Sequence, residues 1–115
     1  MGSEKERIEA IILYCDKIDE MLNEFGKDED IFVDKPIFQY ASSFCISQIG
    51  ECVKSLSPGL TKKYPEVNWK GISGMRDVIV HGYSKIDLGR IWILISEEIP
   101  ALKTACERIL REMRS

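Results

Sequence analysis

The sequence predicts an all-α protein, a bundle of four or five helices. Apolar residues recur at steps of three and four along most of the 115 residues, which is the spacing of one helix face. The alternation typical of half-buried strands is nearly absent, and Gly and Pro residues separate the periodic segments. A chain of this length is predicted to form one domain, residues 1–115, around a single core.

The first helix is expected over about residues 4–25, with Gly26 as its stop. An acidic loop is expected from Lys27 to Asp34. Asp34 is then predicted to cap a second helix, which starts at Lys35-Pro36 and ends near Leu56. Two apolar stripes are predicted to face inward: Ile8, Ile11, Ile12, Cys15, Ile18, Leu22 and Phe25 in the first helix, and Phe38, Ala41, Phe44, Cys45, Ile49, Cys52 and Leu56 in the second.

A loop is expected to follow the second helix, from Ser57-Pro58-Gly59 to Val67. Asn68 is expected to cap a short turn that carries Trp69, and the indole is predicted to anchor that turn in the core.

The third helix is expected over about residues 75–82, because Gly71 and Gly74 interrupt the pattern before it. Asp87 is a suitable N-cap for the last helix. The apolar stripe of that helix stays in register across Pro100, so the proline either kinks one long helix or starts a new one. The stripe consists of Leu88, Ile91, Trp92, Ile95, Ile99, Leu102, Cys106, Ile109 and Met113.

Charge and hydropathy restrict the partners of the protein. The net charge of −3 argues against a strongly basic nucleic-acid-binding domain. Residues 1–34 carry eleven acids against four bases, whereas residues 35–115 carry eight acids and twelve bases. An anionic ligand is therefore expected to approach the second half. There is neither a membrane-spanning apolar run nor an apolar signal-peptide core, so a cytoplasmic protein without a membrane partner is expected.

Four cysteines, Cys15, Cys45, Cys52 and Cys106, raise the question of a disulfide or a zinc site. Their spacing contains no C-x2-C pair, and only one histidine is available to join them. They fall on apolar helix faces, so reduced thiols that pack as small core residues are predicted. Neither a metal nor a cofactor is expected.

The third helix carries the residues most suited to chemistry. His81 is the only histidine, with Arg76 five positions before it and Tyr83 two after it. Arginine binds phosphate in a bidentate fork, histidine transfers protons near neutral pH, and tyrosine offers a hydroxyl for modification. Asp77 lies one turn before His81 and can contact it. Taken alone, the pattern also fits a packed histidine beside a structural Arg76–Asp77 pair, and a packing role for Tyr83.

The geometry of one helix predicts a homodimer. Arg76 and His81 lie about 140° apart around the helix axis and cannot easily reach one phosphate. Cleavage of RNA through the 2′-hydroxyl also requires an acid and a base, whereas one chain supplies one histidine. A two-fold dimer would bring two copies of both residues into one cleft. The third and last helices are expected at the interface, since Trp92 and Ile99 exceed the needs of one monomer.

The order of several motifs resembles a known family, the HEPN superfamily in its HepT-like branch, which includes the toxins of MntA–HepT toxin–antitoxin pairs. The resemblance covers nearly the whole chain. It rests on Ile49-Gly50-Glu51, Lys63-Tyr64-Pro65-Glu66-Val67-Asn68-Trp69, Gly74-Met75-Arg76-Asp77-Val78-Ile79-Val80-His81-Gly82-Tyr83, Ile86-Asp87-Leu88, Ile91-Trp92 and Ile99-Pro100-Ala101-Leu102-Lys103.

The resemblance implies a dimeric helical bundle in which Arg76, Asp77 and His81 form a metal-independent endoribonuclease site, with tRNA among the candidate RNA substrates. It implies that Tyr83 is adenylylated by a partner, an MntA-like nucleotidyltransferase antitoxin, which silences the toxin. It also implies a place beside the cleft for Glu51.

The sequence departs from the family pattern in two places. Gly82 stands where Asp is common, and Ser84-Lys85 replaces the frequent Phe-Gly. Some members of the superfamily only bind nucleotide or RNA. A non-catalytic binding module that acts as the partner of a nucleotidyltransferase is therefore the alternative to a ribonuclease.

Overall fold

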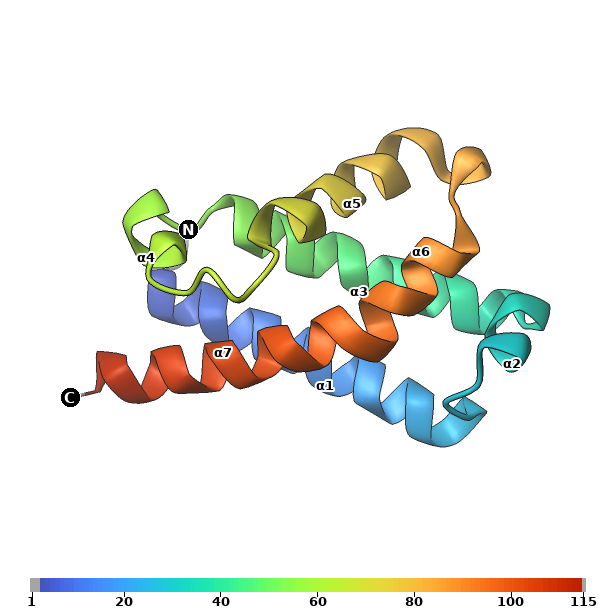
Figure 1. The fold of residues 1–115 in the computed structure, drawn as a ribbon, viewed down its shortest axis with the longest axis horizontal. Coiled ribbons are helices and arrows are strands. Elements are labelled where there is room, and N and C mark those ends of the chain that lie inside the picture. Colours follow the sequence, from blue (N-terminus) through green and yellow to red (C-terminus); the bar gives the residue numbers. More distant parts are fainter. Residues whose placement is uncertain (1–2, 115) are drawn as a thin grey trace.

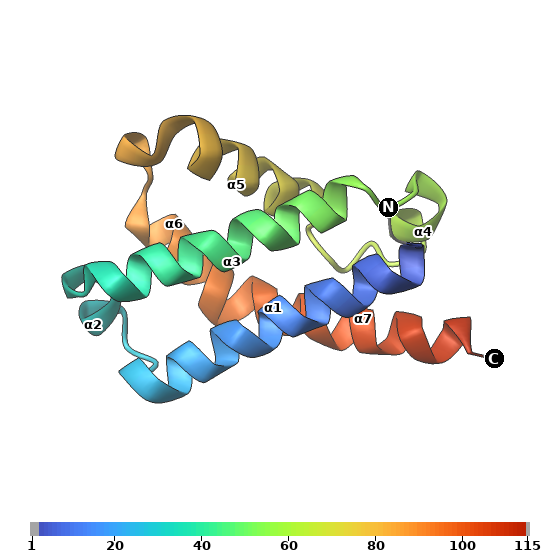
Figure 2. The same ribbon diagram turned by 180° about the vertical axis from the view of Figure 1, so that it is seen from behind.

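The computed structural model describes residues 3–114, which are helical along most of their length and contain no strand. The predicted all-α fold is confirmed. Four longer helices build it: α1 (Glu4–Phe25), α3 (Pro36–Lys54), α5 (Trp69–Gly82) and α7 (Ile99–Met113). α3 runs through the middle, with α5 along one side of it and α1 along the other, and α7 packs on α1 (Figures 1 and 2).

One hydrophobic core joins these helices. Each large apolar side chain in it stabilises the fold by about 1.5–3 kcal/mol relative to an exposed one. The largest fully buried side chains are Phe32, Phe38, Ile8, Ile11, Ile18, Ile46, Ile49, Ile72, Ile91, Leu94, Ile95 and Ile99. None of the helices within residues 3–114 is both long and apolar enough to cross a membrane.

α1 begins and ends as its sequence predicts. Ser3 and Glu6 form a capping box, in which each side chain accepts a hydrogen bond from the backbone N–H of the other residue. Gly26 ends the helix with φ at 107°, a conformation that favours glycine, and its N–H bonds to the carbonyl of Leu22.

The expected acidic loop is a short helix, α2 (Glu29–Asp34). Asp28 caps it by accepting a hydrogen bond from the backbone N–H of Asp30 at 2.8 Å. Phe32 is fully buried, with its ring 5.0 Å from that of Phe38. Asp34 therefore ends α2 and does not cap α3, contrary to the prediction. The buried ring of Phe32 anchors α2, whose other residues are mostly exposed and largely charged.

The inward face of α3 matches the predicted one in part, because Phe38, Cys45 and Ile49 are buried. The N-cap of α3 is Lys35, which makes no capping side-chain hydrogen bond. Phe44 was expected in the core but is 58% exposed. Because α1 and α5 flank α3, the buried face is wide and lies on the opposite side of the helix from Phe44. It consists of Phe38, Ser42, Ser43, Cys45, Ile46, Ile49, Gly50 and Val53.

The segment before α5 also contains a short helix, α4 (Pro58–Lys62), where a loop was expected. Asn68 caps α5 as predicted, accepting a hydrogen bond from the N–H of Gly71 at 3.1 Å. The helix then continues through Gly71 and Gly74, so the predicted break is wrong. Ile72 lies between the glycines and is fully buried. Its burial outweighs the cost of about 1 kcal/mol for each glycine.

The last part of the chain shows how the helical path passes Pro100. Asp87 caps α6 (Leu88–Ile93) as predicted, accepting a hydrogen bond from the N–H of Gly89 at 2.9 Å. A π-helical segment, η2 (Leu94–Glu98), joins α6 to α7. The widened turn lets the helical path continue past Pro100, which lacks an N–H.

Trp92 and Ile99 were expected to need a second copy for burial, and the structure contradicts that reason. Ile99 is fully buried within the chain itself. Trp92 packs on the ring of Phe32 at 5.6 Å and on that of Phe38 at 6.4 Å. Neither residue therefore argues for a dimer interface on the last helix.

Candidate active site

The candidate site includes a close approach between α3 and α5. A Cβ atom added at Gly50 would lie 2.3 Å from the Cβ of Arg76 and 3.3 Å from the carbonyl oxygen of Ile72. Only glycine allows this approach, because real Cβ contacts are never so short. Gly50 was part of the family resemblance, but its steric role could not be read from the sequence.

Arg76 is held by two carboxylates. One terminal nitrogen lies 2.7 Å from Oε2 of Glu51, and the other donates to Oδ1 of Asp77 at 3.1 Å. The guanidinium side chain is 24% exposed, so it is fixed in place but still reached by solvent. Glu51, expected beside the cleft, thus contacts Arg76 directly.

Asp77 has a second partner that the sequence did not reveal. The ammonium of Lys54 lies 2.6 Å from the same Oδ1 atom that Arg76 contacts. The hydrogen bond from Lys54, followed by that from Arg76, holds the pKa of Asp77 below its usual value. A contact between Asp77 and His81 was expected, and the structure does not form it, because Asp77 is engaged with Lys54 of α3. The spacing Glu51-x-x-Lys54, with both residues on one face of a helix, was the available signal.

His81 lies near the C-terminal end of α5 and is exposed. Within residues 3–114 its ring has no hydrogen-bond or ion-pair partner. Arg76, by contrast, faces α3. The chain therefore does not join these two side chains in one contact, as the helix geometry predicts, and the imidazole is free to meet a ligand.

Tyr83 follows Gly82 at the end of α5 and packs back against the protein. It opens a 3-10 turn, η1 (Tyr83–Lys85), and its ring lies 5.7 Å from that of Tyr40 on α3. Its hydroxyl is enclosed and has no hydrogen-bond partner in the part of the chain that the structure describes. An enclosed, unpaired hydroxyl costs about 1–3 kcal/mol.

The four cysteines are free, in agreement with the predicted reduced thiols. Cys15, Cys45 and Cys106 are buried and Cys52 is half-buried. Burial raises the pKa of all four thiols, that of Cys106 to about 12. Among residues 3–114, no group of three or more His, Cys, Asp or Glu side chains is arranged to hold a metal ion.

The helical bundle and its α5 motif define the class of protein, a HEPN-type domain. The chain belongs to the ribonuclease HepT-like family, whose model matches residues 11–109. The resemblance seen in the sequence is therefore confirmed.

Three relatives agree with this assignment. A "Putative RNase" of Methanocaldococcus jannaschii is 34% identical over 84% of this chain and 84% of its own length. A "Putative RNase" of Caldanaerobacter subterraneus is 32% identical over 97% of this chain and 98% of its own. A "Probable ribonuclease HepT" of Thermococcus cleftensis is 31% identical over 78% of this chain and 84% of its own. No solved structure matches the chain significantly. The family and these names support a nuclease of HepT type.

Proposed function

We propose that the protein is the toxin of a toxin–antitoxin pair and acts as a metal-independent endoribonuclease through Arg76, Asp77 and His81. The observation that carries the proposal is the pairing of a fixed arginine with a free histidine on α5. Arg76 is held at 2.7 Å and 3.1 Å by two carboxylates, whereas His81 is exposed and has no hydrogen-bond or ion-pair partner among the described residues. A fixed cation can stabilise the charge that develops on a phosphate, and a free imidazole can transfer a proton.

The reaction follows from these groups. A base removes the proton of a ribose 2′-hydroxyl, and the 2′-oxygen bonds to the adjacent phosphorus. The bond from phosphorus to the 5′-oxygen breaks, and an acid returns a proton to that oxygen, leaving a cyclic phosphate and a free 5′-hydroxyl. His81 of one chain supplies one of these proton transfers, so a second copy supplies the other. Arg76 provides positive charge at the phosphate, and no step requires a metal.

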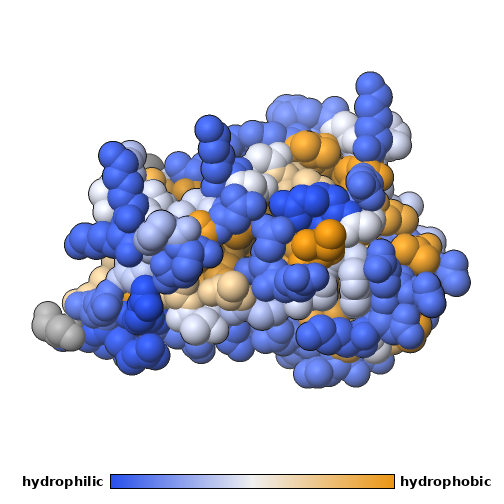
Figure 3. Space-filling view, in the orientation of Figure 1, coloured by the Kyte–Doolittle hydropathy of each residue, from blue (hydrophilic) through white to orange (hydrophobic). Residues whose placement is uncertain are grey.

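An exposed apolar surface supports the dimer that this reaction needs. Ile37, Tyr40 and Phe44, here called the α3 stripe, are 70%, 60% and 58% exposed. α3 lies at the front of Figure 2, with α1 and α5 along its two sides, and among residues 3–114 no helix crosses in front of it. The opposite view, with α7 in front, is dominated by hydrophilic side chains (Figure 3). Contiguous apolar side chains on one uncovered face are typical of a protein interface.

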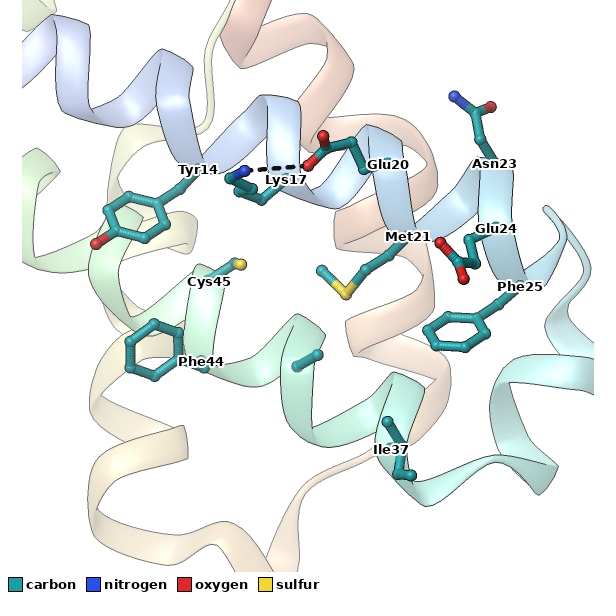
Figure 4. A pocket seen from close by; sticks show the side chains of 11 residues that line it. Tyr14, Lys17, Glu20, Met21, Asn23, Glu24, Phe25, Ile37, Phe44 and Cys45 are labelled. Atoms are coloured by element: carbon teal, nitrogen blue, oxygen red, sulfur yellow. Dashed lines mark ion pairs between the residues drawn. The ribbon is translucent and has the colours of Figure 1, made fainter.

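A groove of about 1080 Å³ lies beside the stripe, between α1 and α3. Phe44 and Ile37 of α3 and Met21 and Phe25 of α1 line it (Figure 4). The same face thus offers projecting apolar side chains and an apolar groove, which is what a two-fold contact with an identical surface requires. The stripe also leads to the site, because Tyr40 contacts the ring of Tyr83.

Adenylylation of Tyr83 by a partner nucleotidyltransferase is the proposed means of silencing. The phenol oxygen would attack the α-phosphate of ATP, release pyrophosphate and lose its proton. Because that hydroxyl is enclosed, the η1 turn has to move away from Tyr40 before the transfer. The attached AMP then adds bulk and negative charge to the helix that carries Arg76 and His81, and so opposes RNA binding.

RNA cleavage by the purified protein tests the proposed activity. The wild type should cleave total RNA equally well with and without EDTA, whereas His81→Ala should lose about 10²-fold or more of the rate. Cleavage that EDTA stops and magnesium restores would contradict metal independence. Binding of RNA without cleavage would favour the non-catalytic module.

Intact mass after incubation with ATP and the partner tests the silencing. The wild type should gain roughly 329 Da, the mass of AMP less water, and the Tyr83→Phe variant should not. Tyr83→Phe should also keep its cleavage activity in the presence of the partner. Silencing with no adduct would show that the partner works by another route.

A further inference from the structure

Four charged side chains meet where α3 packs on α5, and two cations share one carboxylate oxygen. Arg76 bridges Oε2 of Glu51 at 2.7 Å and Oδ1 of Asp77 at 3.1 Å. Lys54 lies 2.6 Å from that same Oδ1. Lys54 is thus the closer partner of Asp77, and no sequence motif assigned it a role.

The four charged side chains together set the net charge next to a bound phosphate. Arg76 with Glu51 and Asp77 alone carries a net charge of −1, which repels a phosphodiester. Lys54 brings the sum of the four groups to zero. Lys54 also occupies the oxygen that Asp77 would otherwise give wholly to Arg76, since Arg–carboxylate pairs favour two parallel hydrogen bonds.

The placement of Lys54 follows from the same turn of α3 that fixes Arg76. Lys54 is one turn beyond Gly50, whose missing side chain lets α3 and α5 come together. Its side chain is 41% exposed, and within residues 3–114 its one ion pair is with Asp77. Lys54 can therefore hold the carboxylate of Asp77 in one orientation through this short contact.

We infer that Lys54 is a positioning residue for Arg76. By holding the carboxylate of Asp77, it keeps the remaining N–H groups of Arg76 free to bind a backbone phosphate, without touching that phosphate itself. The inference rests on the proposed function only in taking RNA as the source of the phosphate.

Substitution of Lys54 should separate binding from chemistry. In Lys54→Met, Asp77 turns both oxygens to Arg76, so the KM for a short RNA should rise about tenfold with a smaller change in kcat. Lys54→Arg keeps the charge and should restore the KM. Lys27→Met removes an exposed lysine from the loop between α1 and α2 and should leave the KM unchanged.

A double variant distinguishes positioning from direct contact. If Lys54 acts through Asp77, Lys54→Met should have no further effect on the KM in an Asp77→Asn background. If Lys54 binds the phosphate itself, the tenfold loss should appear in both backgrounds. That second result would overturn the inference.

The Lys54–Asp77 pair can also be measured without any RNA. In a carbon-13 NMR titration, the pKa of the Asp77 carboxyl should lie below its ordinary value in the wild type and rise in Lys54→Met. Lys27→Met should leave it unchanged. If the pKa of Asp77 is the same in Lys54→Met as in the wild type, the inference is overturned.

Binding of an oligonucleotide that lacks 2′-hydroxyls separates this inference from the proposed activity. Fluorescence anisotropy should show the same tenfold loss of affinity in Lys54→Met and the same non-additivity with Asp77→Asn. If the protein cleaves no RNA but gives these binding results, the proposed ribonuclease activity is wrong and the role inferred for Lys54 still holds. A wild type that does not bind the oligonucleotide would overturn that role.

Discussion

The side chains of the candidate site differ in how firmly their contacts fix them. Arg76 is fixed between two carboxylates, so the cation is preorganised, whereas the imidazole of His81 makes no hydrogen bond or ion pair within residues 3–114. The sequence predicted both residues, because their spacing matches a recognisable motif. It did not predict Lys54, since a pairing between helices depends on their relative rotation and separation. It also left open whether Tyr83 packs, and the ring of Tyr83 packs on that of Tyr40 in α3.

The cysteines allow a prediction about the reactivity of single side chains. At pH 8 the thiolate is the reactive form, and a raised pKa lowers its population. Cys106 is fully buried with a pKa of about 12, whereas Cys52 is half-buried. Peptide mapping after iodoacetamide treatment should therefore find Cys52 alkylated well before Cys106. In urea the two should react alike. Equal rates in the native protein would show that the core around Cys106 opens readily.

At the scale of elements, the contact between α3 and α5 organises the site. The long helices followed from apolar periodicity, but three features did not. α2 depends on one buried phenylalanine, the inward face of α3 depends on two neighbouring helices, and α5 passes through two glycines because Ile72 is buried. Each of these is decided by tertiary packing, which overrides local propensity.

Two glycine substitutions should have opposite effects. Gly50→Ala places a Cβ 2.3 Å from the Cβ of Arg76, so α3 and α5 have to separate. The free energy of unfolding should fall by about 1–3 kcal/mol, and Arg76 should move from its carboxylates. Gly74→Ala on α5 meets nothing within 4 Å and should add about 1 kcal/mol through helix propensity. Urea unfolding at one protein concentration measures both. A Gly50→Ala variant as stable as the wild type would contradict the close approach.

For the whole molecule, the proposed dimer depends on one uncovered face. α7 is in front in Figure 1, and α1 and α3 are in front in the opposite view of Figure 2. The α3 stripe and the groove beside it are formed by residues of α1 and α3. The sequence argued for two copies from the geometry of the motif, but it placed the interface on the third and last helices. Ile99 is instead buried within the chain, Trp92 is partly buried against Phe32, and Phe44, expected inside, is exposed.

A charge in the α3 stripe should dissociate the dimer. Phe44→Asp puts a carboxylate where an apolar ring projects, and an unpaired buried charge in an interface is strongly unfavourable. Sedimentation should show monomers, and cleavage should fall with dimerisation. Ile93→Asp, at a residue 44% exposed on α6, is the matched control and should stay dimeric. A Phe44→Asp protein that remains a dimer would place the interface elsewhere.

Mixing the wild type with an inactive variant tests the shared ribonuclease cleft most directly. The cleft is proposed to use His81 from both chains, so a dimer that contains one His81→Ala chain should be inactive. After subunit exchange in an equal mixture, about a quarter of the dimers contain two wild-type chains. Cleavage of RNA in EDTA should therefore fall to about a quarter of the rate that the wild type alone gives at the same total protein concentration. A mixture that exchanges subunits yet keeps about half of that rate would show that each chain cleaves on its own and would contradict the shared cleft.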